Sequence, residues 1–284
     1  MGELDGRSFI VTGGGTGIGA GIARRLASDG ADVTICGRTE AKLVATAGAI
    51  NHDAGREAVR WHVADVTDEA DVGRVVDAAI ERTGRVHGAV ANAGGGGDLL
   101  PLHLQRAEEF RRVLDLNVVG TFLLLKHLVP HFARSGGGSF IGMSSIAGHL
   151  THPNFGAYGP SKVAIEMLCR SAADEYGEVG IRVNAVRPGL TMSELMGFVS
   201  EDGFGSQVHA SYMAETPLGG ASEVSDVADA VAFLLSDHAA RISGQVLGID
   251  GGQTVRRGPD WTSLVLPRIG GRDVALGLAD PPTA

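Results

Sequence analysis

The chain has 284 residues, of which 44% are hydrophobic and 20% charged, as is usual for a globular protein large enough to bury a full core. Its formal net charge of −9 argues against nucleic acid or an anionic membrane surface as a partner. With no run of 18 apolar residues, no basic leader and two cysteines without metal-ligand spacing, we expect a reduced, cytoplasmic protein that spans no membrane and holds no metal.

A short apolar strand, a glycine-rich turn and a helix open the chain. The strand is expected at 8–11 and the helix at 20–29, and the turn between them is Thr12-Gly13-Gly14-Gly15-Thr16-Gly17-Ile18-Gly19. Glycines allow a tight turn and a close backbone approach, and the N-terminus of a helix favours a pyrophosphate. In this context the motif predicts dinucleotide binding, while the alternative is a turn that only packs tightly.

The end of the second strand, expected at 32–36, bears on the choice of cofactor. In NAD-binding folds a carboxylate at this point binds the adenosine ribose. Here the strand runs into Gly37 and Arg38, and Asp32 lies too far back. The Arg38 guanidinium suits a 2′-phosphate, although it could instead only stack on adenine. We therefore expect NADP(H) to be preferred and NAD(H) to be possible.

Strands and helices alternate along the rest of the chain. Helices are expected at 39–51, 68–83, 104–133 and 222–236, and strands at 58–63, 86–91, 139–143, 182–186 and 245–249. This alternation predicts an α/β fold, a single doubly wound Rossmann-type domain of about seven parallel strands with helices on both faces and ligands at the carboxyl ends of the strands. Asp65, directly after the third strand, could accept the adenine amino group there, or it could cap the next helix.

Four polar residues are candidates for catalysis. Tyr158 and Lys162 are four apart, so on a helix they share a face, and the ammonium would lower the pKa of the phenol towards working pH. Ser145, upstream of them, could hold a substrate oxygen against the phenol. Asn117 lies in an apolar run and must find partners, which are a structural water or Lys162 if its role is functional, and other core groups if it is structural.

Taken together, these residues resemble the short-chain dehydrogenase/reductase family over residues 5–252. The motifs that carry the resemblance are Thr12-Gly13-x-x-x-Gly17-x-Gly19, Asn92-Ala93-Gly94, Asn117, Ser145, Tyr158-x-x-x-Lys162 and Pro188-Gly189-x-Thr191, in the family's order and spacing. One departure concerns Thr16, which stands where many NADP-using members carry a basic residue. This departure leaves Arg38 as the main argument for NADP(H).

The resemblance implies a role for each position. Tyr158 would be the general acid and base, Lys162 would lower its pKa and bind the nicotinamide ribose, Ser145 would orient the substrate oxygen, and Asn117 would hold a water linked to Lys162. The implied cofactor-binding residues, besides Tyr158 and Lys162, are Gly13, Thr16, Gly17, Ile18, Gly19, Arg38, Asp65, Val66, Asn92, Ala93, Gly94, Pro188, Gly189 and Thr191.

The chemistry implied by the resemblance is hydride transfer between nicotinamide and the carbonyl or secondary alcohol of a mainly apolar small molecule. Two alternatives stay open: an acyl-thioester reductase acting on a 3-oxoacyl or enoyl substrate, and a non-catalytic protein that senses the dinucleotide. The family usually forms tetramers that pair the helices of Asn117 and Tyr158, so a homotetramer is expected.

Two segments lie outside the motifs. Residues 190–220 combine apolar side chains with glycines, and we expect them to form a mobile lid over a mainly apolar pocket to which His152 and Phe155 contribute. Residues 253–284 form a C-terminal extension that is too apolar around Trp261 for a solvated tail. We expect this extension to pack on the body of the domain or on a neighbouring subunit.

Overall fold

One parallel sheet of seven strands forms the centre of the molecule. The computed structural model describes residues 2–193, 199, 205–256 and 261–282, and the strands lie in the order β3-β2-β1-β4-β5-β6-β7. They are β1 (Ser8–Thr12), β2 (Asp32–Gly37), β3 (Val59–Val63), β4 (Gly88–Ala91), β5 (Gly138–Met143), β6 (Ile181–Pro188) and β7 (Val246–Ile249). The order reverses between β1 and β4, which opens the crevice where doubly wound sheets bind ligands. The predicted fold class is confirmed.

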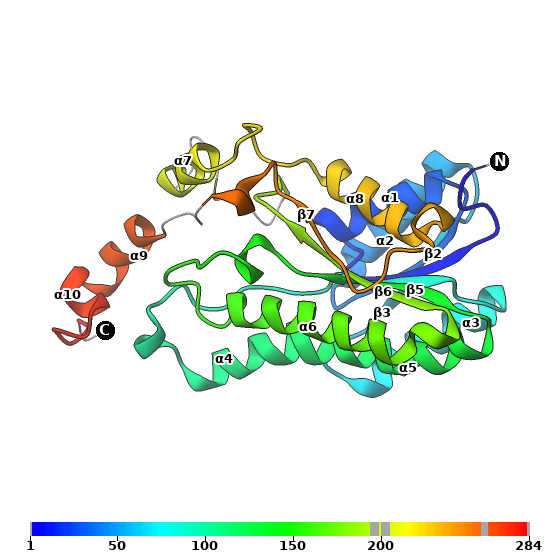
Figure 1. Ribbon diagram of the computed structural model, residues 1–284, viewed down its shortest axis with the longest axis horizontal. Coiled ribbons are helices and arrows are strands. Elements are labelled where there is room, and N and C mark those ends of the chain that lie inside the picture. The colour runs from blue at the N-terminus through cyan, green and yellow to red at the C-terminus, as the bar shows by residue number, and fades with distance from the viewer. Residues whose placement is uncertain (1, 194–198, 200–204, 257–260, 283–284) are drawn as a thin grey trace.

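Helices cover both faces of this sheet (Figure 1). The α-helices of the described residues are α1 (Gly17–Ser28), α2 (Glu40–Ala54), α3 (Glu69–Thr83), α4 (Ala107–Leu114), α5 (Gly120–Arg134), α6 (Tyr158–Tyr176), α7 (Ser206–Ala214), α8 (Val224–Leu235), α9 (Thr262–Ile269) and α10 (Arg272–Ala275). Apolar residues of α1, α2 and α8 share one core cluster, and those of α3, α5 and α6 share a second.

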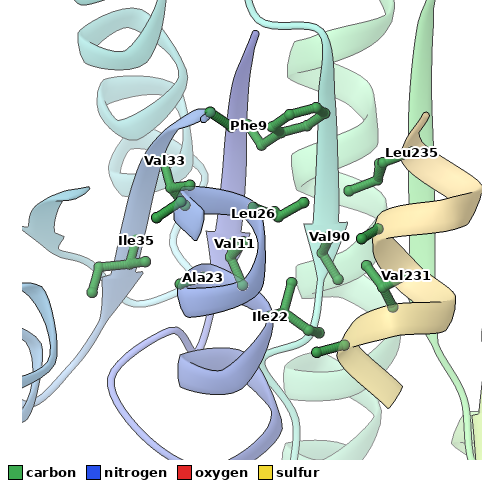
Figure 2. Close-up of a cluster of buried hydrophobic side chains, with 14 of the residues drawn as sticks. Phe9, Val11, Ile22, Ala23, Leu26, Val33, Ile35, Val90, Val231 and Leu235 are labelled. Carbon is green, nitrogen blue, oxygen red and sulfur yellow. The ribbon is translucent and has the colours of Figure 1, made fainter. Parts of the chain in front are cut away.

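The core beneath α1 and α8 shows how apolar spacing becomes packing (Figure 2). Ile22 and Leu26 repeat at four residues on α1, Val231 and Leu235 do the same on α8, and each is at most 2% exposed. All four lie in one cluster with Val11 of β1. Each buried side chain of this size contributes about 1.5–3 kcal/mol. This packing holds α1 against the sheet, with its N-terminus at the carboxyl end of β1.

The helical region predicted at 104–133 is present as a continuous run, Ala107–Arg134, but it is not one regular α-helix. A 3-10 turn at Leu102–Leu104 comes first, and a π-helical turn, Asp115–Val119, separates α4 from α5. A π turn places an extra residue in the helical repeat, and such turns are frequent at functional sites. Here it carries the fully buried Asn117, whose side chain reaches Ser161 of α6.

Length and composition alone make the helical run Ala107–Arg134 a candidate membrane span, which differs from the expectation that no such run exists. The most apolar window of this run is 44% buried inside the protein. Leu124 and Leu128, at most 1% exposed, belong to the second core cluster. A core helix of this kind has the same length and composition as a span.

The helices α9 and α10 lie at one end of the molecule, on the side of α7 and away from the N-terminus (Figure 1). Of the predicted lid, the structure describes α7, whereas 194–198 and 200–204 lie outside the described residues. In the C-terminal extension, Trp261 is fully buried in a cluster with Leu190 and Tyr212 of the same chain. Packing on a neighbouring subunit stays a prediction.

Candidate active site

A cavity of about 470 Å³ opens at the carboxyl ends of β1, β4, β5 and β6. It brings together most of the residues that the sequence singled out, namely Gly13, Thr16, Gly17, Ile18, Gly19, Asn92, Ala93, Gly94, Ser145, Tyr158, Lys162, Pro188, Gly189 and Thr191. The described lining does not include Arg38, Asp65, Val66 or Asn117.

The glycine turn after β1 is packed so tightly that it excludes side chains. A Cβ on Gly19 would lie 2.3 Å from the carbonyl oxygen of Gly13, which itself has a left-handed φ of +65°. The Asn92 amide donates to the carbonyls of Thr12 and Gly13 at 2.9 and 3.3 Å, and so clamps the turn against the end of β4. The N-terminus of α1 meets the cavity at Gly17, where the helix dipole favours a pyrophosphate. The turn therefore fits a dinucleotide.

Tyr158 begins α6, Ser145 follows β5, and both side chains line the cavity, where the Ser145 hydroxyl is near enough to act on the phenol. The Ser145 Oγ also accepts a hydrogen bond from the backbone N–H of Ala147 at 3.2 Å, at the start of a 3-10 turn (Ile146–Gly148). Burial raises the pKa of Tyr158, and the neighbouring Ser145 hydroxyl opposes this rise. The phenol is therefore neutral at pH 7 and can donate a proton.

Lys162 lies one turn along α6 from Tyr158 and is almost completely buried. Its Nζ donates to the Met143 carbonyl at 2.8 Å and lies 5.3 Å from the centroid of the Tyr158 ring. Burial lowers the pKa of Lys162 to about 8. The lowering of the Tyr158 pKa that the sequence predicted is not the net result, because burial of the phenol is the largest effect and acts in the opposite direction.

The Asn117 amide makes three hydrogen bonds within the protein. Its Nδ2 donates to the Gly95 carbonyl at 3.0 Å and to the Ser161 Oγ at 2.8 Å, and its Oδ1 accepts from the Gly95 N–H at 2.9 Å. These bonds hold the loop after β4 against α6, as the structural interpretation of Asn117 expects. Its holding of a water for Lys162 stays a prediction.

Asp65 and Arg38 lie beyond the ends of β3 and β2, on the expected adenosine side. The Asp65 Oδ1 accepts hydrogen bonds from the backbone N–H and the hydroxyl of Thr67, at 3.0 and 2.8 Å. The bond from the Thr67 backbone is the largest cause of a lowered pKa at Asp65, and the Thr67 hydroxyl and the charge of Arg38 lower it further. The helix cap of α3 is Asp68, so the cap interpretation of Asp65 is wrong. Arg38 itself is exposed.

The loop after β6 forms a rigid wall of the cavity. The Gly189 N–H donates to the Ile249 carbonyl at 2.9 Å, and a Cβ on Gly189 would lie 2.9 Å from the Cα of Asp250. The Thr191 hydroxyl donates to the Gly189 carbonyl at 3.2 Å. Because a backbone hydrogen bond ties this loop to the end of β7, the predicted nicotinamide end of the site is held in place.

Aromatic side chains line the cavity beside Tyr158. His152 and Phe155, which the sequence placed near the pocket, line it together with Tyr212 of α7. The Phe155 and Tyr158 rings meet edge to face at 4.9 Å between centroids, and the His152 and Tyr212 rings lie 6.2 Å apart. Burial raises the pKa of Tyr212, so its hydroxyl stays neutral. Sequence reasoning missed Tyr212 because its helix lies in a segment expected to be a mobile loop.

Sequence reasoning also missed a buried ion pair next to Ser144, at the end of β5. Arg187 of β6 pairs with Glu166 of α6, and Glu166 also accepts a hydrogen bond from the Ser144 Oγ at 2.7 Å. The one usable signal is that Glu166 follows Lys162 by one helical turn. Nothing in the sequence identifies Arg187 as its partner.

The arrangement suits proton transfer to or from an oxygen beside a bound dinucleotide. A neutral phenol and a hydroxyl converge on one point, a buried amine lies behind them, and the glycine turn provides an anion site on the same cavity. Among the described residues, no group of three or more His, Cys, Asp or Glu side chains is arranged to hold a metal ion.

Comparisons with known proteins identify the family. The family model described as "Enoyl-(Acyl carrier protein) reductase" matches residues 13–254. The cis-4-hydroxycyclohexanecarboxylate dehydrogenase of Sinomonas cyclohexanicum is 39% identical over 249 residues, which are 87% of this chain and 96% of that protein. The chain therefore belongs to the short-chain dehydrogenase/reductase family and is an oxidoreductase of that family, as the sequence predicts.

Solved structures agree with this assignment. A short-chain type dehydrogenase/reductase from Mycobacterium ulcerans is 43% identical with a TM-score of 0.93, and the match covers 97% of this chain and 99% of that one. A 7α-hydroxysteroid dehydrogenase, solved with NADH and 7-oxo glycochenodeoxycholic acid, is 32% identical with a TM-score of 0.82, and the match covers 88% and 94%. The cofactor class of the family is NAD(P)(H).

Proposed function

We propose that the protein transfers a hydride between NADP(H) and the carbonyl or secondary alcohol of a cyclic, mainly apolar small molecule. The observation that carries this proposal is the convergence of Ser145, Tyr158 and Lys162 on one cavity, beside its aromatic wall. The printed names of two relatives support ring substrates, because one is a hydroxycyclohexanecarboxylate dehydrogenase and the other a hydroxysteroid dehydrogenase.

The residues of the site divide the proton chemistry between them. In reduction the neutral phenol of Tyr158 gives its proton to the carbonyl oxygen, and in oxidation the phenolate takes a proton from the alcohol. The Ser145 hydroxyl orients that oxygen. Lys162, with a pKa of about 8, is cationic at pH 7 and stabilises the phenolate that remains after proton transfer. The nicotinamide cofactor, when bound, supplies or accepts the hydride.

The residues present fit such a cofactor. The turn from Gly13 to Gly19 would hold its pyrophosphate, and the loop from Pro188 to Thr191 would hold its nicotinamide end. One observation favours NADP(H): Arg38, at the end of β2, is exposed, and no carboxylate stands at that position. Two observations favour NAD(H): the carboxylate of Asp65 lies near enough to Arg38 for the arginine to lower its pKa, and the steroid dehydrogenase was solved with NADH.

The decisive experiment titrates the protein with NADPH and NADH by nicotinamide fluorescence and then adds ring ketones. We expect NADPH to bind at least tenfold more tightly and to be oxidised by one class of ring ketone. Arg38→Ala should weaken NADPH binding about tenfold, the scale of one lost charge-assisted hydrogen bond, and leave NADH binding unchanged. A wild-type preference for NADH would overturn the cofactor assignment and leave the reaction type standing.

Reduction of an acyl thioester is the second candidate, and the description of the matching family model favours it. The arginines of the C-terminal extension, which could grip a carrier phosphate, are partly engaged: Arg256 donates to the Ala214 carbonyl at 2.8 Å, and Arg268 also has a partner. Arg257 lies outside the described residues. Faster turnover of a 3-oxoacyl or enoyl thioester than of any ring ketone would replace our proposal. Tight NADPH binding without turnover of either class would support a non-catalytic sensor.

We further propose a homotetramer that pairs α5 and α6 between subunits. Phe122 on α5 and Val163 and Met167 on α6 are 43%, 50% and 57% exposed, and large apolar side chains gathered on one surface mark association sites. Light scattering on the eluting protein measures the assembly. Met167→Glu should yield smaller species, and a tetramer that survives this substitution would place the interface elsewhere.

A further inference from the structure

Trp261 lies behind the aromatic wall of the cavity rather than on its surface. It has no exposed area, and its ring stacks on Phe155 with 4.8 Å between centroids and an interplanar angle of 29°. It meets Tyr212 edge-on, at 6.3 Å and 89°. Phe155 and Tyr212 both line the cavity. One residue of the C-terminal extension therefore backs two separate parts of the wall.

Phe155 connects Trp261 to the catalytic phenol. Its ring meets the Tyr158 ring at 4.9 Å and 79°, an edge-to-face contact of the kind that aromatic pairs favour. The three rings of Trp261, Phe155 and Tyr158 thus form a continuous series from the extension to the start of α6.

The backbone around Phe155 forms a tight turn, and the ring extends from this turn towards Trp261. Asn154 has a φ of +68° and Gly156 a φ of +52°, so Phe155 is flanked by two residues in the left-handed region. For Asn154 this conformation is uncommon and persists because surrounding contacts favour it. Besides the ring contacts above, Phe155 has a ring contact with His152 at 5.8 Å and a backbone bridge to Leu100. Its N–H donates to the His152 carbonyl and its carbonyl accepts from the Tyr158 N–H, both at 3.2 Å. The backbone bonds fix the turn, and stacking on Trp261 is the ring contact that joins the Phe155 side chain to the C-terminal extension.

We propose that Trp261 is a positioning residue that holds Phe155 and Tyr212 as a rigid aromatic wall and thereby makes the site select rigid ring ketones over open-chain ones. This inference rests on the proposed carbonyl chemistry. A fixed wall gives a rigid ring its full contact at no cost in torsional freedom, whereas a flexible chain must lose rotamers to make the same contact. Loosening the wall should therefore penalise ring substrates more than open-chain ones.

The test compares kcat/KM for cyclohexanone and 2-hexanone, or for the best ring and open-chain ketones of equal carbon number. In Trp261→Leu we expect the ratio of ring to open-chain kcat/KM to fall at least tenfold, mainly through KM for the ring ketone. Trp261→Phe, which keeps an aromatic ring, should retain the ratio within threefold. Leu276→Ala, a control at a 61% exposed position in the same extension, should leave both values unchanged. A uniform fall of both values in Trp261→Leu, with the ratio preserved, would overturn the inference.

Two further measurements keep the inference testable if Trp261→Leu does not fold or if no ketone is turned over. Phe155→Leu removes the ring through which Trp261 acts, so it should lose the same selectivity, and the double variant should be no worse than either single one. Additive losses would overturn the inference. Thermal shifts with the same ketones, in the presence of oxidised cofactor, report binding without turnover. If the wild type binds ring ketones selectively but reduces none of them, and Trp261→Leu loses this selectivity of binding, the proposed function fails and the role of Trp261 stands. If the wild type reduces ring ketones and Trp261→Leu keeps the selectivity, the proposed function stands and the role of Trp261 fails.

Discussion

Arg187 and Glu166 form a two-pronged ion pair behind the corner that carries Ser145. The Arg187 Nε and Nη2 donate to the two carboxylate oxygens of Glu166 at 2.9 and 2.7 Å, and the side chains are 12% and 5% exposed. Glu166 Oε1 also accepts from the hydroxyl of Ser144, which donates in addition to the Lys162 carbonyl at 3.2 Å. The pair therefore joins β6, α6 and the end of β5 at the site.

Replacing one partner of this pair should be far more harmful than replacing both. Arg187→Met leaves the Glu166 carboxylate buried and uncompensated, which is expected to lower the free energy of unfolding by about 3–5 kcal/mol. The same change leaves Glu166, which accepts the Ser144 hydrogen bond, without its ion partner, and the resulting shift of Glu166 should reduce kcat about tenfold by misplacing Ser145. Urea denaturation and steady-state kinetics of the purified variants measure the two effects.

The double variant Glu166→Met/Arg187→Met removes both charges and should recover much of the lost stability. Arg24→Ala is the matched surface control, because its ion pair with Asp53 joins side chains that are 53% and 57% exposed. Its unfolding curve should coincide with that of the wild type. A double variant as unstable as Arg187→Met would show that packing, not charge, decides the cost.

The proton role of Tyr158 predicts a loss of rate with little loss of binding. Tyr158→Phe keeps the ring that packs against Phe155 but removes the hydroxyl, so kcat should fall by about 10²–10⁴ while cofactor affinity stays near wild type. Tyr176→Phe, at the other end of α6, is the control and should leave kcat unchanged. Retention of more than a tenth of wild-type kcat in Tyr158→Phe would assign the proton transfer to another group.

The sequence predicts the parts of this site that follow from the sheet. Asn92, Ser145 and Pro188 each stand at or just beyond the end of an apolar strand, and parallel strands bring such residues to one edge. The glycine turn can also be predicted from the sequence, because its conformation depends on neighbouring residues of the same segment. Tyr158 and Lys162 are separated by one helical turn, so their proximity also follows from sequence spacing.

The remaining features depend on contacts between elements that are distant along the chain. Glu166 meets Arg187 only because α6 packs on β6, and no periodicity records that contact. Trp261 reads as one more apolar residue of an extension until its stacking on Phe155 is seen. The rise of the Tyr158 pKa was missed for a related reason, since burial depends on the whole packed environment whereas the charge of Lys162 is visible in the sequence.

Two glycines with opposite surroundings test the packing of the cofactor turn. Gly19→Ala should weaken NADPH binding at least tenfold, because its Cβ would lie 2.3 Å from the Gly13 carbonyl oxygen and the turn would have to shift. Gly48→Ala is the control: this exposed glycine lies inside α2 and a Cβ there meets nothing within 4 Å. It should stabilise the protein by about 0.5–1 kcal/mol and leave binding unchanged. Fluorescence titration and thermal denaturation provide both readouts, and equal NADPH affinities in the two variants would contradict the packing argument.

The buried Lys162 should leave a signature in the dependence of stability on pH. Its pKa is about 8 in the folded protein against an ordinary value of 10.5, so between these values the unfolded chain binds a proton that the native protein does not. Stability from this group therefore rises as pH increases from 8 to 10.5, by roughly 3 kcal/mol in total. Other groups titrate in the same window, and burial raises the pKa of Cys36 and Cys169 to about 12, which acts in the opposite direction.

The informative quantity is thus the wild-type free energy of unfolding minus that of Lys162→Met, measured in urea at several pH values. This difference should be constant below pH 8 and rise above it, whereas a difference that stays flat up to pH 10.5 would show that the lysine keeps its ordinary pKa in the folded protein.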